Sequence, residues 1–167
     1  MNQTRVFIGV GSNIERHQNI RAGLQSLQQQ VGELHISSVY ESMPIGFSAP
    51  PFFNLVVSFS TQDDVFSVYQ LLKDLERPYD CRVTKEKFTS RALDLDLLLF
   101  GDAILSNEQF KLPRKDIEIY PFVLEPLAEI APDLVHPTKK ITYLALWLAM
   151  DKRTVKQSKI AYSELSL

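Results

Sequence analysis

The sequence of 167 residues contains one cysteine, Cys81, so an intrachain disulfide framework is excluded and a reducing compartment is favoured. Its three histidines, His17, His35 and His136, are scattered and lack the spacing of zinc ligands. No run approaches the roughly 18 apolar residues that a membrane span needs, and the apolar stretch before Gly11 is too short for a signal peptide. We therefore expect a cytoplasmic protein that does not bind a membrane.

The chain also lacks a large excess of positive or negative charge. The chain has 18 basic and 20 acidic residues, a net charge of −2, which gives no electrostatic case for a nucleic-acid partner. No G-x-x-x-x-G-K-[ST] phosphate-binding loop occurs. With 45% hydrophobic and 23% charged residues, the composition is that of an ordinary globular protein. The length predicts a single domain over residues 1–167, and we expect it to be a monomer.

Apolar periodicity and turn residues predict six elements in the first hundred residues: strand 6–10, helix 15–31, strands 34–42 and 53–60, helix 65–77 and a strand from about 94. Asp63 or Asp64 would cap the second helix and Pro78 would end it. This β-α-β-β-α-β order predicts an α+β ferredoxin-like sandwich, with an antiparallel sheet covered by helices on one face. Two short helices, at 122–130 and 142–150, form a C-terminal helical extension. Residues 151–167 are either a mobile tail or an edge strand.

Two carboxylates stand two residues apart in the apolar run at 93–99. Residues i and i+2 of a strand share a face, so Asp94 and Asp96 point the same way. The leucines at 93, 95, 97 and 99 would fill the opposite face. Carboxylate oxygens suit hard cations such as magnesium, which usually also hold substrate phosphates. The alternative is the solvated face of an edge strand.

A basic loop at 82–91 precedes this pair. It contains four cations, Arg82, Lys85, Lys87 and Arg91. Cations beside a metal-binding acid pair suit a polyphosphate, although a solvated surface loop would have a similar composition. Together the loop and the carboxylates indicate nucleotide chemistry without a phosphate-binding loop of the P-loop type.

With these features in hand, the sequence resembles the 6-hydroxymethyl-7,8-dihydropterin pyrophosphokinase family, folate-pathway enzymes of ferredoxin-like fold. The similarity covers about residues 6–137. It depends on short segments that occur in the same order as in the family, at 11–13, 40–46, 51–54, 91–96, 122–127 and 129–132. Each segment alone is common, but their order makes a specific match.

The resemblance implies a magnesium-dependent pyrophosphokinase, a 2-amino-4-hydroxy-6-hydroxymethyldihydropteridine diphosphokinase. Such an enzyme moves pyrophosphate from its co-substrate ATP to the hydroxymethyl oxygen of the pterin and releases AMP. By position, Asp94 and Asp96 would bind two magnesium ions. The protein side chains would then take little part in covalent chemistry, because the ions offset the charge that builds on the phosphates.

Pterin recognition in this family stacks the flat ring between two aromatic side chains. The matching positions are Phe52 and Phe122 for stacking, Asn54 for the ring edge, and the backbone at Ser42 and Ile45. Aromatic faces hold a planar ring, and an Asn offers both donor and acceptor to its edge. Without the resemblance, the two phenylalanines would rather be assigned to the core.

The ATP-contacting positions depart most from the family pattern. Arg82 and Arg91 are the catalytic candidates, and both of them, with Glu76 and Arg114, are the candidates for binding ATP. Glu76 could equally be a solvated helix end. The chain has Asp-Cys-Arg-Val-Thr at 80–84 for Gly-Arg-x-Arg, and Lys-Phe-Thr-Ser-Arg at 87–91 for Arg-Trp-Gly-Pro-Arg. Arg114 stands for a histidine after Pro113, and Tyr-Pro at 120–121 replaces an arginine.

Two rival hypotheses stay open. The weakened ATP positions favour a pterin-binding carrier or regulator that has lost or altered the transfer activity, whereas the retained Asp94 and Asp96 favour the enzyme. A ferredoxin-like interaction domain is the third possibility. It would leave the basic loop and Asn54 unexplained.

Overall fold

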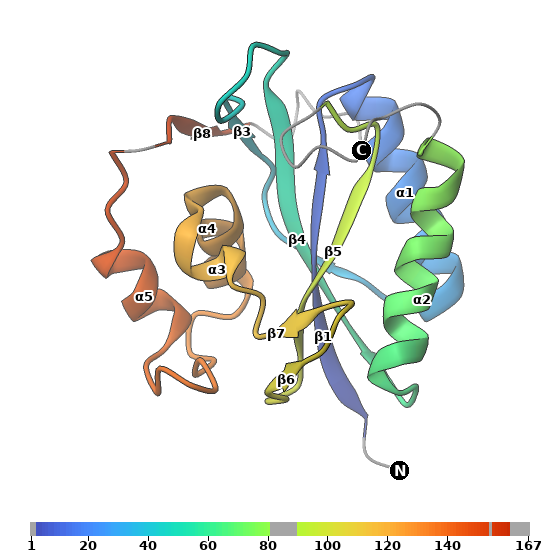
Figure 1. Cartoon of the computed structure of the whole chain (residues 1–167), viewed down its shortest axis with the longest axis vertical. Helices are drawn as coiled ribbons and strands as arrows, with labels where there is room; N and C mark the ends of the chain where they lie inside the picture. The colour runs from blue at the N-terminus through green and yellow to red at the C-terminus, as the bar shows by residue number, and fades with distance from the viewer. Residues whose placement is uncertain (1–2, 81–89, 154, 161–167) are drawn as a thin grey trace.

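A computed structural model describes residues 3–80, 90–153 and 155–160 of the chain. Its centre is an antiparallel sheet in the order β5-β1-β4-β3-β8, with the short strand β2 also paired to β4 (Figure 1). The strands are β1 (Thr4–Ser12), β2 (His35–Ile36), β3 (Tyr40–Ser42), β4 (Phe52–Thr61), β5 (Asp94–Phe100) and β8 (Gln157–Lys159). The predicted α+β class and antiparallel sheet are confirmed.

The two long helices, α1 (Arg16–Val31) and α2 (Val65–Glu76), pack on one face of the sheet (Figure 1). Their apolar stripes meet the inward side chains of β1 and β4 in the larger core cluster. Asp64 caps α2, since its carboxylate accepts hydrogen bonds from the backbone N–H groups of Phe66 and Ser67. A single 3₁₀ turn, η1 (Arg77–Tyr79), follows and contains Pro78.

As expected for the β-α-β-β-α-β unit, α1 and α2 lie on one face of the sheet, and the C-terminal helical extension, whose position the sequence did not predict, covers the other face. The helices of this extension are α3 (Asp116–Ile119), α4 (Pro121–Ile130) and α5 (Tyr143–Ala149) (Figure 1). A second core cluster joins them to the sheet, with Phe7, Val56 and Leu98 facing Leu124 and Leu127. Among the described residues, no helix has the length and apolarity needed to cross a membrane.

A bulge in the β1–β5 ladder corrects the prediction for Leu99. Phe7 pairs with Leu99 but Ile8 pairs with Leu97, so the register shifts by one residue. Leu95 and Leu97 lie in the larger core, as expected, whereas Leu98 and Leu99 both lie in the second core. Because an extra residue reverses side-chain alternation, the simple period of two fails after the bulge.

The predicted strand at 34–42 is divided into β2 and β3. Ile36 pairs with Val57 and Tyr40 with Asn54, so one residue more is present on this side of the ladder. Ser37 helps to bridge the interruption, because its hydroxyl accepts a hydrogen bond from the backbone N–H of Val56. The irregularity bends the chain without breaking its pairing to β4.

Three further segments complete the described structure. A hairpin of β6 (Leu105–Ser106) and β7 (Lys111–Leu112) forms a separate two-stranded sheet that the sequence did not indicate. The edge-strand alternative for the C-terminal segment is confirmed at residues 157–159, where β8 pairs with β3. The rest of the C-terminal segment, from residue 161, lies outside the described residues.

Candidate active site

A cavity of about 940 Å³ brings the predicted site residues together. It lies between β1, β3, β4 and β5 and is bounded by residues of α2, α4 and the segment after β3. Ten of the eleven residues proposed from sequence line it: Ser42, Ile45, Phe52, Asn54, Glu76, Arg91, Asp94, Asp96, Arg114 and Phe122. The eleventh, Arg82, lies outside the described residues.

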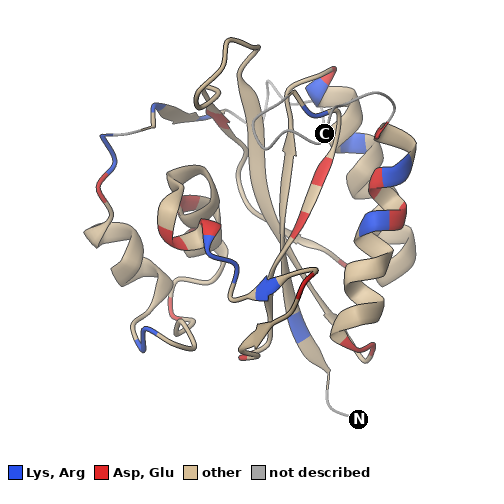
Figure 2. Ribbon diagram, in the orientation of Figure 1, with Lys and Arg blue, Asp and Glu red and all other residues tan. Residues whose placement is uncertain are grey.

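Asp94 and Asp96 stand on β5 opposite two glycines of β1. Asp94 pairs with Gly11 and Asp96 with Gly9, so no side chain from β1 covers the space between the strands at these positions. A Cβ at Gly11 would lie 3.3 Å from the Asn54 Oδ1, so glycine also leaves room for that amide. Figure 2 shows the acidic positions of β5 beside the mixed charges of α2.

The electrostatics of this acid pair suit a cation. Burial raises the pKa of Asp96 to about 8, and the charge of Asp94 adds to the rise against the opposing effect of Arg114. The Asp96 side chain keeps 26% of its surface exposed, so a ligand can reach it. In the part of the chain that the structure describes, no three His, Cys, Asp or Glu side chains form a metal cage. Two carboxylates fit magnesium, which takes its other ligands from phosphates and water.

Arg114 is held beside the acid pair from two sides. Its Nη2 lies 3.2 Å from Asp96 Oδ1, and its Nε donates to Asp116 Oδ2 at 2.8 Å. Its backbone N–H donates to the Leu98 carbonyl, which fixes the chain against β5. The guanidinium therefore faces the cavity already engaged by two carboxylates.

Arg91 is positioned through its backbone by the Gly-Ser-Asn turn that follows β1. The Arg91 N–H donates to Asn13 Oδ1 at 2.7 Å, and the Arg91 carbonyl accepts from the Asn13 N–H at 3.0 Å. Asn13 also donates from its amide to Ser90 Oγ and the Pro50 carbonyl. The motif at 11–13 thus fastens two of the segments that border the cavity.

Glu76 is buried, with 6% of its surface exposed, so it is not a solvated helix end. Its Oε1 accepts from the backbone N–H of Leu95 at 2.6 Å, and its Oε2 accepts from Lys73 Nζ at 2.6 Å. Burial raises the pKa of Glu76, and the hydrogen bonds from Lys73 and Leu95 oppose that rise. Its carboxylate joins α2 to the strand that carries the acid pair.

Lys73 is a cavity residue that the sequence reasoning missed. Burial lowers the pKa of Lys73, but the Glu76 hydrogen bond and the charges of Glu76, Asp96 and Asp94 outweigh burial and raise it. Its position three residues before Glu76 could have identified it as a cavity residue, because residues i and i+3 share one helix face. Lys73 therefore keeps its positive charge and contributes it to the acid pair from α2.

Aromatic side chains and an amide line the other part of the cavity. Phe52 and Phe122 are both half-buried and line it, so neither is a core residue. Phe47 packs edge-on against Phe52 with centroids 6.5 Å apart, and Tyr120 stacks on Phe122 at 5.0 Å. Asn54 Nδ2 donates to Ser42 Oγ at 2.7 Å, which orients the amide. Phe47 and Tyr120 were not predicted.

Comparisons with known proteins agree on one family. The sequence model of the 7,8-dihydro-6-hydroxymethylpterin-pyrophosphokinase (HPPK) family matches residues 7–132 of this chain. The 2-amino-4-hydroxy-6-hydroxymethyldihydropteridine pyrophosphokinase of Haemophilus influenzae is 35% identical over 142 residues, which cover 81% of this chain and 86% of that protein. The enzyme of the same name from Pseudomonas aeruginosa is 34% identical, covering 80% of this chain and 84% of the relative.

The fold has solved counterparts as well. A crystal structure of Plasmodium falciparum HPPK-DHPS A437G with SDX-DHP superposes with a TM-score of 0.68 at 13% identity, covering 88% of this chain. This chain spans 42% of that longer protein, so the likeness concerns the fold of one part of it. The sequence matches and the shared fold lead to one conclusion: the chain belongs to the 7,8-dihydro-6-hydroxymethylpterin-pyrophosphokinase family.

Proposed function

We propose that this chain transfers pyrophosphate from ATP to 6-hydroxymethyl-7,8-dihydropterin in folate biosynthesis. The observation that supports this most is the cavity, in which an acid pair and a cation face half-buried aromatic side chains and an oriented amide. Membership of the family supports the same reaction. We also propose that the protein acts as a cytoplasmic monomer without a nucleic-acid or membrane partner, in keeping with its single cysteine and its net charge of −2.

The pterin would occupy the aromatic part of the cavity. Phe52 and Phe122 would hold the two faces of the ring, and Asn54 would pair with its edge. Backbone groups of Ser42 and Ile45 would complete the polar contacts. In this placement the hydroxymethyl group would point toward β5.

The triphosphate would lie against β5 and α2. Asp94 and Asp96 would hold two magnesium ions, which when bound neutralise charge on the phosphates. Lys73, Arg91 and Arg114 would contact phosphate oxygens. Arg82, which lies outside the described residues, is a further candidate for this role from the sequence. Glu76 lines the same cavity and would act on the nucleotide mainly by holding Lys73.

The side chains then orient an in-line displacement. The hydroxymethyl oxygen forms a bond to the β-phosphorus, and the bond from that phosphorus to the α–β bridging oxygen breaks. The hydroxyl proton is lost to solvent, and AMP leaves with the bridging oxygen. Lys73 and Arg114 would offset the negative charge that develops on the departing oxygen.

The test is a two-step titration. The protein is titrated with 6-hydroxymethyl-7,8-dihydropterin by calorimetry, and MgATP is then added while AMP is measured. We expect pterin binding followed by stoichiometric AMP release. Pterin binding without AMP would instead support the carrier or regulator, a rival that the engagement of Arg114 by Asp96 and Asp116 favours. Absence of pterin binding would overturn both.

A further inference from the structure

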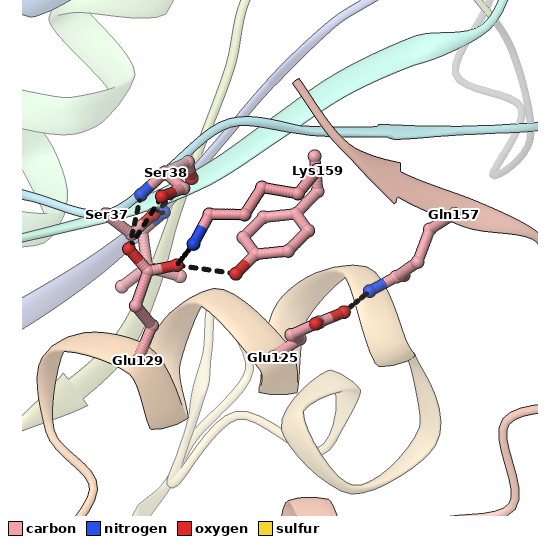
Figure 3. A network of polar contacts seen from close by, with 8 residues as sticks. Ser37, Ser38, Glu125, Glu129, Gln157 and Lys159 are labelled. Carbon is pink, nitrogen blue, oxygen red and sulfur yellow. Dashed lines mark hydrogen bonds and ion pairs between the residues drawn. The ribbon is translucent and has the colours of Figure 1, made fainter. Parts of the chain in front are cut away.

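A polar network joins helix α4 to the edge strand β8 (Figure 3). Gln157 Nε2 donates a hydrogen bond to Glu125 Oε2, and Lys159 Nζ lies 3.8 Å from Glu129 Oε2. The two glutamates are four residues apart on a helix and the two partners are two apart on a strand, so each pair shares a face. Glu129 also accepts hydrogen bonds from Ser38 and from the Tyr40 hydroxyl, so its end of α4 is joined to β3 directly, whereas Glu125 is joined to β8 through Gln157.

The same strand is bonded to the wall of the cavity that carries Ser42. In the β3–β8 ladder, Gln157 lies directly opposite Ser42. The backbone N–H of Met43 donates to the Lys156 carbonyl at 3.4 Å, which extends the pairing into the segment that contains Ile45. A second cavity of about 300 Å³ is lined by residues 43–46, Val155 and Lys156. The backbone bond to Lys156 is therefore one of the contacts that hold this segment beside the main cavity.

The other end of the Gln157 contact belongs to the helix that carries Phe122. Glu125 stands one turn after Phe122 on α4, so movement of Glu125 along the helix axis moves the ring with it. Among the described residues, Gln157 Oε1 is buried without a hydrogen-bond partner. A buried unpaired amide oxygen is costly, so packing alone does not explain a glutamine here.

We infer that Gln157 is a positioning residue for the pterin pocket. Its hydrogen bond to Glu125 fastens the Phe122 end of α4 to the strand position opposite Ser42, while the Glu129 bonds to Ser38 and Tyr40 fasten the other end. Gln157 therefore fixes the separation of the two walls at the pterin end of the helix. The inference rests on the proposed function, because Ser42 and Phe122 matter here as pterin contacts. Gln157 itself does not line the main cavity.

The test compares Gln157→Met with Ser158→Ala in the full chain. Methionine keeps the volume of the side chain and removes its donor, whereas Ser158 is an exposed neighbour on the same strand. For Gln157→Met we expect the KM and the Kd for the pterin to rise about three- to tenfold, part of the loss when a charge-assisted bond is removed. The KM for MgATP should stay at its wild-type value, which separates an effect on the pterin pocket from a general loss of folding. Ser158→Ala should change none of these quantities.

Two further variants test the hydrogen bond between Gln157 and Glu125 directly. Gln157→Lys supplies an ammonium donor to Glu125 and should restore most of the pterin affinity. Glu125→Met and Gln157→Met should not be additive in the double variant, since both remove one shared bond. Unchanged pterin constants in Gln157→Met, or equal rises in the pterin and ATP constants, would overturn the inference. A wild-type protein that binds no pterin would instead overturn the proposed function.

Discussion

At the scale of single residues, Asp94 and Asp96 form an arrangement that the unliganded protein does not need for stability. They stand two apart on one strand, opposite glycines, and the pKa of Asp96 is raised to about 8 by burial and by its neighbour. Like charges at this spacing disfavour the ionised state. Such a pair fits a cation ligand better than a packing role.

We expect Asp94→Asn and Asp96→Asn each to lower turnover by at least about a hundredfold, the size of effect seen when one charge-stabilising group is removed from a transition state. Pterin binding and the unfolding temperature should not fall, because the amide keeps the shape of the side chain and relieves the repulsion. AMP release at saturating magnesium and calorimetric pterin titration measure the two effects. Turnover near wild type in either variant would contradict the metal role.

His136 provides a residue-scale test that is independent of the active site. It is 1% exposed, and its Nδ1 accepts hydrogen bonds from the backbone N–H groups of Thr138 and Lys139. Burial lowers the pKa of His136 against the opposing charge of Glu118, 3.4 Å away from Nε2, and Lys139 adds to the lowering. The unfolded chain therefore takes up this proton at a higher pH than the folded chain does.

The free energy of unfolding should consequently decrease as the pH falls from about 7.5 to about 5.5, through the ordinary histidine range. In His136→Asn, whose side-chain oxygen can still accept a bond from the turn, this part of the decrease should disappear. Urea unfolding of both proteins at the two pH values measures the difference. Parallel decreases in the two proteins would exclude His136 as the cause.

At the scale of elements, Glu76 connects α2 to β5 through the Leu95 backbone and holds Lys73 at the cavity. Glu76→Ala leaves the Leu95 N–H without its partner, so we expect a loss of about 1–3 kcal/mol in the free energy of unfolding. Glu76→Gln keeps an acceptor oxygen and should lose much less. Denaturant unfolding of the two variants measures this. A lower affinity for ATP in Glu76→Ala with unchanged stability would show that its role is in binding alone.

The helices and strands also show which parts of the fold sequence patterns can predict. Apolar periodicity predicted α1, α2 and the long strands, because each has one face buried against a large core. It placed Leu99 wrongly and joined β2 to β3, since a bulge inserts one residue without a distinctive sequence signal. The β6–β7 hairpin has strands of two residues, too short to show any period.

At the scale of the whole molecule, the cavity is assembled from segments far apart in the sequence. The alternation of β5 predicted the acid pair from local pattern alone, but Phe52, Phe122 and Asn54 were found only through the family resemblance. Lys73, Phe47 and Tyr120 were missed, because their place depends on how α2, α4 and the segment after β3 meet around the sheet. Local patterns do not contain that long-range information.

The relative affinities for the pterin and for MgATP test the site as a whole. The residues proposed for the pterin all line the cavity, and Arg114 is engaged by Asp96 and Asp116. The family resemblance implies in addition that several ATP-contacting cations are replaced in this sequence. Each lost charge-assisted contact costs about 1.5–3 kcal/mol, or roughly ten- to hundredfold in affinity, so two losses would put the Kd for MgATP in the millimolar range. We therefore expect calorimetry to show tighter binding of the pterin than of MgATP. Tight MgATP binding with no measurable pterin binding would reverse this order, and it would remove the pyrophosphokinase and the pterin carrier together.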